Sequence, residues 1–553
     1  PKNSKMRVLP SLIVISVSIV SGFQIDPSNQ QISDDCGRAR IFHGVNAVEK
    51  EFPYIPSTSD DFSQQNTLGD ADADFLQGLG MNMVRLGVLV VGTMPTENTI
   101  NSTYLSEVRT MIEALDTRGI ATLVDAHQDV LSPKLCGEGL PDWMVEKALA
   151  LVGFNTSDTS KTFPYPLPFE IEVDPNTGYP SVDSCMENGF FFYYFSEESE
   201  KLWHSLYSEP EIWADMSTHW GSVASSLAGT KGLLGYEMLN EPWSAMPGTE
   251  TSKRSPLSDN ATLGALYNNL YAAVREQDTD ALFFFEPLVL SSYEMVIPGH
   301  TTDFPPGGPG ADPTTGEVSD MKSVFAYHSY CPSNPDGSPS HLPLCQELIH
   351  AAWQGVGRNL DKLGPSVGGF LTEFGAVGDG ETDVELLEWQ TAKADAYLQS
   401  WSYWTYKSYD DVTTQNAHTE TFFNTDGSYQ IPKIKALSRT YAQAIAGSPS
   451  SMLFNSTSSQ FDLIFTSGIQ SDTCDMSTEG NTYVTEIFMH MDFYYSNGYA
   501  ITILIDGVDM TNDVSPPTVL SSGSTDLGAW QVMGLSLDSS YANKEVSFTI
   551  TAL

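Results

Sequence analysis

The sequence predicts an α/β protein, namely a (β/α)8 TIM barrel followed by a C-terminal antiparallel β-sandwich domain. Short apolar runs alternate with helical stretches from about residue 40 to 440, and polar residues gather at the ends of those runs. After about residue 440, apolar and polar residues alternate instead. The predicted domains are a signal peptide at 1–22, the barrel at 23–440 and the sandwich at 441–553, which suits a chain of 553 residues.

The barrel strands are predicted from eight apolar runs, because continuous apolar strands are typical of a parallel sheet covered by helices. The runs lie at 42–48, 81–88, 120–129, 232–242, 281–287, 323–330, 367–375 and 401–407. Between them lie segments such as 104–119, in which Leu105, Val108 and Ile112 share one helical face. A doubly wound open sheet is the alternative, but no G-x-G-x-x-G sequence follows any of these runs.

The sandwich is predicted from four later segments in which apolar and polar residues alternate between clusters of Ser, Gly, Asn and Asp. They are "FDLIFT" (461–466), "NTYVTEIFMH" (481–490), "YAITILIDG" (499–507) and "EVSFTITAL" (545–553). The boundary between the two domains is expected within 442–452.

The charge balance excludes some partners. The chain carries 70 acidic and 26 basic residues, a formal net charge of −44 at pH 7. Phosphate binding needs clustered Lys and Arg, so nucleic acid is not an expected partner, and docking on anionic membranes is disfavoured. The acidic residues are spread along the chain, which indicates a strongly solvated surface.

The first residues differ from the rest of the chain. "PKNSKMR" is basic, and the apolar "VLPSLIVISVSIVSG" is shorter than the roughly 20 residues of a membrane span. This pattern predicts a secretory signal peptide and a soluble mature chain, either secreted or in a lysosomal or digestive lumen. Candidate glycosylation sequences begin at Asn101, Asn155, Asn260 and Asn455.

Six cysteines follow the signal peptide, and an even number in an oxidising compartment favours disulfides. Six cysteines allow 15 connectivities, and the sequence alone does not choose among them. We expect Cys136 to pair with Cys185 and Cys331 with Cys345. No C-x-x-C or Cys–His cluster indicates a metal site, so none is expected.

Polar residues cluster at the C-terminal ends of the predicted strands, the face at which TIM barrels build active sites. They are Asn46, Arg85, Asp125, His127, Asn240, Glu241, Tyr330, Glu373 and Trp404. Glu241 is predicted to end the fourth strand and Glu373 the seventh. Two carboxylates that face each other across a cleft are the minimum equipment for hydrolysing a glycosidic bond.

We assign Glu241 as the general acid/base and Glu373 as the nucleophile, at a separation of roughly 5 Å that suits retention of configuration. Their repulsion raises the pKa of the carboxyl group that is less stabilised as an anion, and so keeps that group protonated. Arg85 and Tyr330 are expected to hydrogen bond to Glu373 and stabilise its charge.

Other polar residues are expected to meet the sugar at the cleavage site. Asn240 would contact its 2-hydroxyl, an interaction that strengthens in the transition state. Trp404 would offer an aromatic face to the sugar. His127 is equally compatible with a contact to the sugar and with a packed loop histidine. A Ser-His-Asp hydrolase is not expected, because no G-x-S-x-G sequence occurs.

These motifs resemble glycoside hydrolase family 5 of clan A, in which "NEP" carries the acid/base and a glutamate of strand seven is the nucleophile. Within that family the chain is similar to the endoglycoceramidases, which release intact glycans from glycosphingolipids. The motifs are "GVNAVEKEFPY" (44–54), "DAHQDV" (125–130), "LPFE" with "FFYYFSEE" (167–198), "YEMLNEPW" (236–243), "YHSYC" (327–331), "TEFGA" (372–376) and "WSYWTYK" (401–407).

The resemblance implies a glycosphingolipid substrate and neither a metal nor an organic cofactor. It also implies a set of glycan contacts besides the two glutamates. These are Lys50, Asp125, His127, Asn240, Tyr330 and Trp404, with Asp129 as a further polar contact.

One long connection bears on the lipid. The segment 141–203 exceeds the usual length between barrel elements and holds the aromatic sequences "FPYPLPF" (163–169) and "FFYYF" (191–195). It forms either a satellite core under a long loop or an apolar wall on the acceptor side of the cleft, where a ceramide would lie. Both interpretations can hold together.

The function expected from the sequence is therefore a retaining endo-glycosidase that separates the oligosaccharide of a glycosphingolipid from its ceramide, with transient contact to lipid surfaces. The first alternative is a glucosylceramidase-like, β-glucanase or mannanase activity of the same family. The second is a glycan-binding protein without catalysis, which gains nothing from two carboxylates that repel each other.

Overall fold

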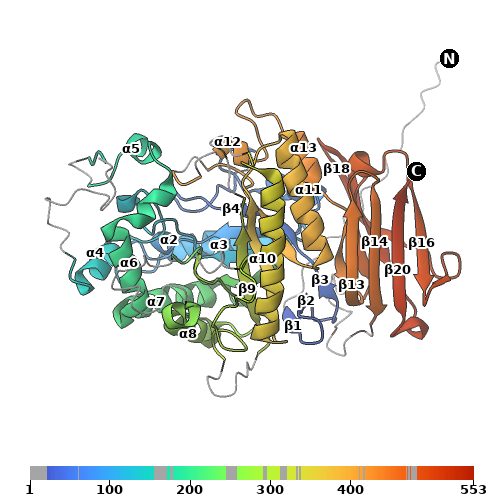
Figure 1. Cartoon of the computed structure of the whole chain (residues 1–553), viewed down its shortest axis with the longest axis horizontal. Coiled ribbons are helices and arrows are strands. Elements are labelled where there is room, and N and C mark those ends of the chain that lie inside the picture. The colour runs from blue at the N-terminus through green and yellow to red at the C-terminus, as the bar shows by residue number, and fades with distance from the viewer. Residues whose placement is uncertain are drawn as a thin grey trace, which may run out of the picture.

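The computed structural model of the chain describes residues 22–59, 62–154, 171–174, 178–243, 258–289, 295–311, 320–331, 334, 338–409, 412–414, 417–468, 470, 474 and 483–553. A closed parallel barrel lies beside a pair of antiparallel sheets, which confirms the predicted fold class (Figure 1). The predicted signal peptide lies outside these residues except for Gly22. Among the helices of these ranges, none is long and apolar enough to cross a membrane.

Eight strands of the described part form the barrel, and β11 pairs with β4 to close it. They are β4 (His43–Ala47), β5 (Met83–Gly87), β6 (Ala121–Asp125), β7 (Leu233–Glu237), β8 (Leu282–Phe285), β9 (Ser323–Ser329), β10 (Val367–Gly375) and β11 (Ser400–Trp404). Each strand overlaps one of the apolar runs, so the prediction of eight strands is confirmed.

The helix α3 (Ser102–Asp116) illustrates how the chain turns from one strand to the next. The Asn101 side chain accepts a hydrogen bond from the Tyr104 backbone N–H and caps the helix, whose apolar face is buried. The other helices around the barrel in the described ranges are α1 (Asp70–Gly78), α2 (Val90–Thr93), α4 (Asp142–Leu151), α5 (Val182–Met186), α6 (Glu197–Ser208), α7 (Pro210–Leu227), α8 (Asp259–Gln277), α10 (Leu342–Leu363), α11 (Glu381–Ala396), α12 (Ala417–Glu420) and α13 (Ile431–Leu437).

The barrel interior is apolar toward the N-terminal ends of its strands. Met83, Leu123 and Phe370 belong to a buried cluster there, which Phe23 and Ile25 from the start of the described chain complete. The N-terminal segment therefore closes this end of the barrel, and the polar residues of the strand tips lie at the other end.

The sandwich consists of two antiparallel sheets that share one apolar core. One sheet has the order β1 (Gln24–Asp26), β2 (Gln31–Ser33), β3 (Ala39–Arg40), β12 (Tyr441–Ile445), β15 (Thr485–His490), β19 (Gly528–Leu535) and β18 (Thr518–Thr525). The other has the order β13 (Gly447–Asn455), β14 (Gln460–Ser467), β20 (Glu545–Ala552), β16 (Tyr499–Ile505) and β17 (Val508–Asp509). In β14, Phe461, Leu463 and Phe465 are buried, as the alternating pattern predicts.

The strands β1 to β3 come from the part of the sequence that we assigned to the barrel, yet they extend a sandwich sheet. Ala39 and Arg40 of β3 pair with Ile445 and Ala444 of β12. Such short strands carry little pattern of their own, and their place is set by a partner about 400 residues away. The exact domain boundary near residue 440 stays a prediction.

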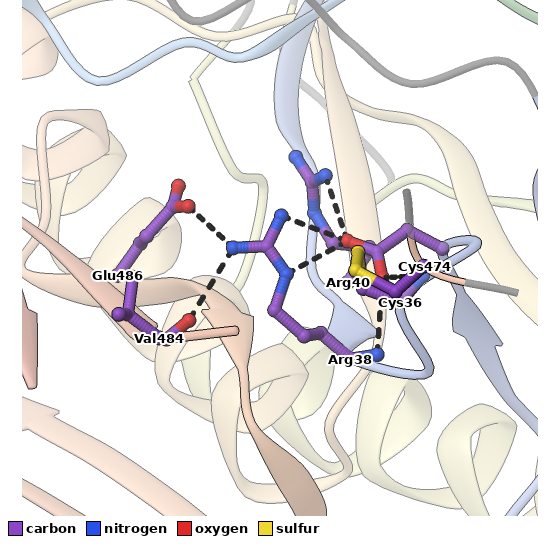
Figure 2. Close-up of a disulfide and its surroundings, with 7 residues drawn as sticks. Cys36, Arg38, Arg40, Cys474, Val484 and Glu486 are labelled. Atoms are coloured by element: carbon purple, nitrogen blue, oxygen red, sulfur yellow. Dashed lines mark hydrogen bonds and ion pairs between the residues drawn. A yellow bond between two sulfur atoms is a disulfide. The ribbon is translucent and has the colours of Figure 1, made fainter. Parts of the chain in front are cut away.

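A buried arginine fixes this N-terminal segment to the sandwich (Figure 2). The Arg38 guanidinium donates to Asp34 Oδ2 at 2.9 Å and to Glu486 Oε1, on β15, at 2.5 Å. Beside it, a disulfide joins Cys36 to Cys474 (Figure 2). The ion pairs and the disulfide therefore hold the N-terminal segment against the sandwich.

All six cysteines are paired. Cys136 is bonded to Cys185 and Cys331 to Cys345, which confirms both expected pairs. The third disulfide, next to Arg38, spans 438 residues of sequence, so its pairing depends on the N-terminal strands lying in the sandwich.

We predict that Arg38→Ala destabilises the protein by about 3–5 kcal/mol, because it removes the buried cation that pairs with both Asp34 and Glu486 and leaves beside Asp34 the more distant Arg40, at 3.4 Å. Urea unfolding, followed by fluorescence, measures the change. Arg118→Ala is the matched control, since Arg118 forms its two ion pairs with Asp70 and Asp74 at the exposed surface and should cost about 1 kcal/mol or less. Equal losses in the two variants would contradict a structural role for the buried pairs.

Candidate active site

The pairing of neighbouring strands brings the predicted residues to one end of the barrel. Asn46 on β4 lies beside Arg85 on β5, and Glu373 on β10 lies beside His328 on β9. Asp125, the last residue of β6, is the neighbour of Glu237, the last residue of β7. These side chains come from strands far apart in the sequence, and the closed barrel alone makes them neighbours.

Arg85 lies at the centre of this group and is fully buried. It donates to Glu373 Oε1 at 2.5 Å, to Glu237 Oε2 at 2.5 Å and to the Asn240 side-chain oxygen at 2.9 Å. It also donates to Asn46 Oδ1 at 3.0 Å. One planar guanidinium with several donors therefore orients several strand tips at once.

Glu373 receives the two contacts that the sequence suggested. Besides Arg85, the Tyr330 hydroxyl donates to its Oε2 atom at 2.7 Å. Its side chain is about 6% exposed, so both bonds act on a carboxylate that is mostly removed from water. The two donors stabilise the negative charge of Glu373 and fix its direction.

The prediction that Glu241 ends the fourth strand is wrong. Glu241 lies four positions after Glu237, the last residue of β7. The apolar run continues past the strand because Met238 and Leu239 are buried in the loop rather than paired in the sheet. The loop is held by backbone bonds, such as that from Asn240 N–H to the Ala126 carbonyl. Glu241 itself has φ near +40°, a constrained conformation for a residue with a side chain.

His328 joins the two glutamates, and the sequence analysis did not identify it. Its Nδ1 atom lies 2.7 Å from Glu241 Oε1 and 3.5 Å from Glu373 Oε2. A ring nitrogen and one oxygen of each carboxylate all lie within 4.8 Å of one another. The signal was present in "YHSY", because His328 and Tyr330 are two positions apart and share a face of the strand end.

Burial sets the protonation of this group. It raises the pKa of the Glu241 carboxyl to about 7, with the Asp129 carboxylate as the next cause, so much of Glu241 is protonated near neutral pH. Burial also lowers the pKa of His328 to about 4, so that imidazole is neutral. A protonated carboxyl beside a stabilised carboxylate is the pairing that an acid and a nucleophile need.

Two further carboxyl groups, Glu237 and Glu286, lie beneath the pair and were not predicted. Burial raises the pKa of Glu237 to about 7. Burial and then the charge of Glu237 raise the pKa of Glu286 well above its usual range. Glu286 accepts a hydrogen bond from the Glu241 backbone N–H at 3.3 Å, so a neutral carboxyl group supports the strained loop.

The remaining predicted residues form a second group beside the first. Lys50 Nζ donates to Asp129 Oδ2 at 2.8 Å and lies 4.9 Å from the centre of the Trp404 ring. His127 stacks on Trp404 at 5.4 Å, and its Nδ1 atom lies 2.7 Å from Asp125 Oδ2. Although burial opposes it, the Asp125 carboxylate raises the pKa of His127 to about 9.

Asp125 links the two groups, because its Oδ2 atom also lies 3.1 Å from Arg85 Nη2. The structure therefore brings all ten predicted residues into one continuous site. They are Lys50, Arg85, Asp125, His127, Asp129, Asn240, Glu241, Tyr330, Glu373 and Trp404.

Three sets of His and acidic side chains are close enough together to hold a metal ion among the described residues. In the set of His127, Asp129 and Glu138, the Lys50 ammonium already lies 2.8 Å from Asp129 and 3.2 Å from Glu138. A side-chain cation thus occupies the place that a metal would take. The other two sets share His328 with the glutamate pair.

A cavity of about 290 Å³ opens directly beside Glu241. Glu241, Glu286, His328, Ser329 and Tyr330 supply its polar lining. The rest of its lining is apolar and consists of Val289, Val296, Leu348, Ile349 and Ala352. The acid therefore lies at the boundary between a polar site and an apolar recess.

Comparison with known protein families identifies the family of the chain. The profile described as "Cellulase (glycosyl hydrolase family 5)" matches residues 45–410, a span that includes Glu241 and Glu373. The chain belongs to glycoside hydrolase family 5. The profile of the "Glycoside hydrolase family 5 C-terminal domain" matches residues 439–521, within the sandwich.

Relatives within family 5 narrow the resemblance. The chain is 32% identical over 491 residues to an endoglycoceramidase of Cyanea nozakii, covering 87% of this chain and 86% of that protein. It is 31% identical to an endoglycoceramidase of Hydra vulgaris, covering 89% and 86%. The structure of endo-glycoceramidase II from Rhodococcus sp. in its ganglioside GM3 complex has a TM-score of 0.63 at 18% identity, over 94% of this chain and 98% of that one.

We predict that Glu286→Gln keeps most of the glycosidase activity of this family 5 enzyme, because glutamine reproduces a neutral carboxyl group that accepts from Glu241 N–H. Glu286→Ala removes the acceptor and should lower kcat/KM by about tenfold to a hundredfold. The experiment measures kcat/KM of both variants as a function of pH. Thermal unfolding of the same variants checks that they are folded. Equal losses in Gln and Ala would show that Glu286 must be charged.

Proposed function

We propose that this family 5 glycosidase is an endo-acting, retaining enzyme that hydrolyses the β-glycosidic bond between the oligosaccharide and the ceramide of glycosphingolipids. The products are the intact glycan and ceramide. The observation that carries the proposal is the apolar cavity beside Glu241, because the acid of a glycosidase faces the leaving group. The relatives named endoglycoceramidase support the same substrate class.

In the first step, a Glu373 carboxylate oxygen forms a bond to the anomeric carbon of the first sugar. The bond from that carbon to the ceramide oxygen breaks, and the ceramide oxygen takes the proton of Glu241. Arg85 and Tyr330 hold Glu373 in the direction of attack. The result is a glycosyl ester on Glu373 and free ceramide.

In the second step, the Glu241 carboxylate removes a proton from water, and the water oxygen attacks the anomeric carbon. The ester bond breaks, and its electrons return to the Glu373 carboxylate, which completes a double displacement with net retention. One oxygen of Glu241 lies within 4.8 Å of one oxygen of Glu373. This short separation supports retention, because an inverting pair needs a wider gap to hold a water molecule.

The apolar recess fits the lipid half of the substrate. Leu344, one helical turn before the lining residue Leu348 on α10, is 54% exposed, and Ile297, next to the lining residue Val296, is 49% exposed, so apolar surface continues beyond the cavity. A ceramide has two hydrocarbon chains that would cover such a surface. Polar contacts from Asn240 and Lys50 would hold the sugar on the other side of the cleaved bond.

The aromatic insert packs against the loop that carries Glu241. Tyr194 stacks on Trp243, two residues after Glu241, at 4.6 Å, while Phe191 and Phe192 are 39% and 49% exposed. The insert thus has a packed core and an exposed apolar face, in agreement with both readings of the sequence. The other aromatic sequence, at 163–169, lies outside the described residues.

The compartment is part of the proposal. Three disulfides fit an oxidising environment, in line with a secreted, lysosomal or digestive enzyme. The exposed apolar residues near the recess would make transient contact with a lipid surface while the substrate is extracted.

We predict that kcat/KM falls as the pH rises above about 7, because Glu241 must be protonated to act as acid and its pKa is raised to about 7. Glu241→Gln should lower the rate by about 10²–10⁴-fold and abolish this basic limb. Glu237→Gln is the control, since the pKa of Glu237 is also raised to about 7. If the limb disappears in Glu237→Gln instead, the acid is wrongly assigned.

We expect mass spectrometry to detect an intact oligosaccharide and free ceramide after incubation with a ganglioside in mild detergent. The Glu373→Gln variant should release neither, because the amide cannot act as the nucleophile. A first product with β configuration by NMR would support retention, and an α product would refute it. Release of glucose from glucosylceramide, or of short sugars from a β-glucan, without action on the ganglioside would instead favour the glucosylceramidase-like or β-glucanase activity.

A further inference from the structure

We propose that the disulfide between Cys331 and Cys345 fixes one wall of the apolar cavity and so determines how well the enzyme accepts a lipid leaving group. This inference rests on the proposed function and names a specificity determinant of the same site. The two cysteines are positioning residues, because they act through the cavity wall rather than on the reacting atoms. The disulfide joins the chain just after β9 to the first turn of α10.

The β9 end of the disulfide is held next to the nucleophile. Ser329 is the last residue of β9, so Tyr330 and Cys331 lie beyond the hydrogen-bonded sheet. The Tyr330 hydroxyl nevertheless donates to Glu373 Oε2 at 2.7 Å. This hydrogen bond therefore fixes the position of Cys331 relative to the reacting groups.

The α10 end of the disulfide supports the cavity. Leu348, Ile349 and Ala352 are the residues by which α10 lines it. Cys345 lies four positions before Ile349, and residues at this spacing share one face of a helix. Cys345 and Ile349 are both buried, with exposed fractions of 2% and 3%. The disulfide therefore acts on the face of α10 that bounds the cavity.

The first turns of α10 have little packing besides this disulfide. Between Leu342 and His350, a stretch that the structure describes completely, only Cys345 and Ile349 are buried. Leu344 and Leu348 are 54% and 36% exposed. An apolar cavity is space that other side chains leave empty, so a helix beside it lacks the dispersion contacts that hold a packed helix. The covalent bond compensates for those missing contacts.

The rest of α10 is anchored independently of the disulfide. Trp353 is buried, and its ring meets the ring of Tyr327 on β9 edge-on at 5.8 Å. Arg358 donates to the Met295 carbonyl at 2.9 Å, beside the lining residue Val296. Breaking the disulfide should therefore loosen the start of α10 and leave the helix as a whole in place.

The catalytic pair and another part of the cavity wall are also held without the disulfide. The Val289 backbone N–H donates to the Pro242 carbonyl at 2.9 Å, which ties this lining residue to the loop that carries Glu241. Arg85 holds Glu373. A displaced start of α10 therefore leaves the acid and the nucleophile in place, and it removes apolar contact only from the leaving group.

The test compares two substrates that share one glycan and differ in the leaving group, namely lactosylceramide and a soluble aryl lactoside. The Cys331→Ser/Cys345→Ser variant should lower the ratio of kcat/KM for the ceramide to that for the aryl substrate by about tenfold. Cys36→Ser/Cys474→Ser is the matched control, because that disulfide lies at the sandwich. The control should lower the unfolding temperature and leave the ratio unchanged. An unchanged ratio in the first variant, or an equal change in both, would overturn the proposal.

Reduction of the folded wild-type protein is a second measurement, which does not require the variant to fold. A dithiol opens the disulfides, the new thiols are alkylated, and peptide mass spectrometry reports which of the three bonds is open. The ratio should fall in proportion to the fraction of protein in which Cys331 and Cys345 are alkylated. A ratio that stays constant while this bond opens would overturn the proposal.

The Leu348→Ser variant separates this inference from the proposed function. Leu348 lines the cavity and is 36% exposed, so its substitution should preserve the fold while it lowers the same ratio. A lower ratio in Leu348→Ser, with no change when the disulfide is removed, would keep the lipid in the cavity and reject the role of the disulfide. Failure of the wild type to cleave lactosylceramide, with cleavage of the aryl lactoside retained, would instead refute the proposed function.

Discussion

The arrangement of the active site depends on one buried cation. Arg85 contacts the nucleophile candidate Glu373, the loop residue Asn240 and the strand-end residues Asn46 and Glu237. A guanidinium removed from water is stable only when carboxylates and amide oxygens satisfy it. Because Arg85 must be hydrogen bonded on all sides, the ends of β4, β5, β7 and β10 and the loop after β7 are held in one geometry.

That single cation faces more carboxyl groups than it can neutralise. Asp125, Glu237, Glu286 and Glu373 all lie within 4 Å of its guanidinium nitrogens. The excess is resolved by protonation, since burial raises the pKa of Glu237 to about 7 and, with the charge of Glu237, raises the pKa of Glu286 well above its usual range. Burial, followed by the charge of Asp129, raises the pKa of Glu241 to about 7, so much of Glu241 carries the proton that an acid catalyst requires near neutral pH.

The site also joins two unlike surroundings. On one side of the glutamate pair lies an apolar recess, and on the other lie Lys50, Asp129 and His127. The glycolipid that we propose as substrate has the same division into an apolar and a polar half. The barrel can present two such surroundings because loops after different strands have different compositions, while the glutamates stay fixed on the common frame.

The sequence by itself determined the barrel, because eight strands buried on both faces need eight apolar runs. It also determined the sandwich, because strands with one buried face need alternating apolar and polar residues. It also determined the catalytic glutamate candidates, because "NEP" and "TEFG" end such runs. Only the tertiary structure decided that β1 to β3 join the sandwich and that Cys36 pairs with Cys474, since these depend on contacts across about 400 residues. It likewise revealed Glu237 and Glu286 as members of the site, and it showed that His328, two positions before Tyr330, lies between the two glutamates. The role of Glu237 and Glu286 follows from burial beside Arg85, and proximity in a closed barrel leaves no pattern along the chain.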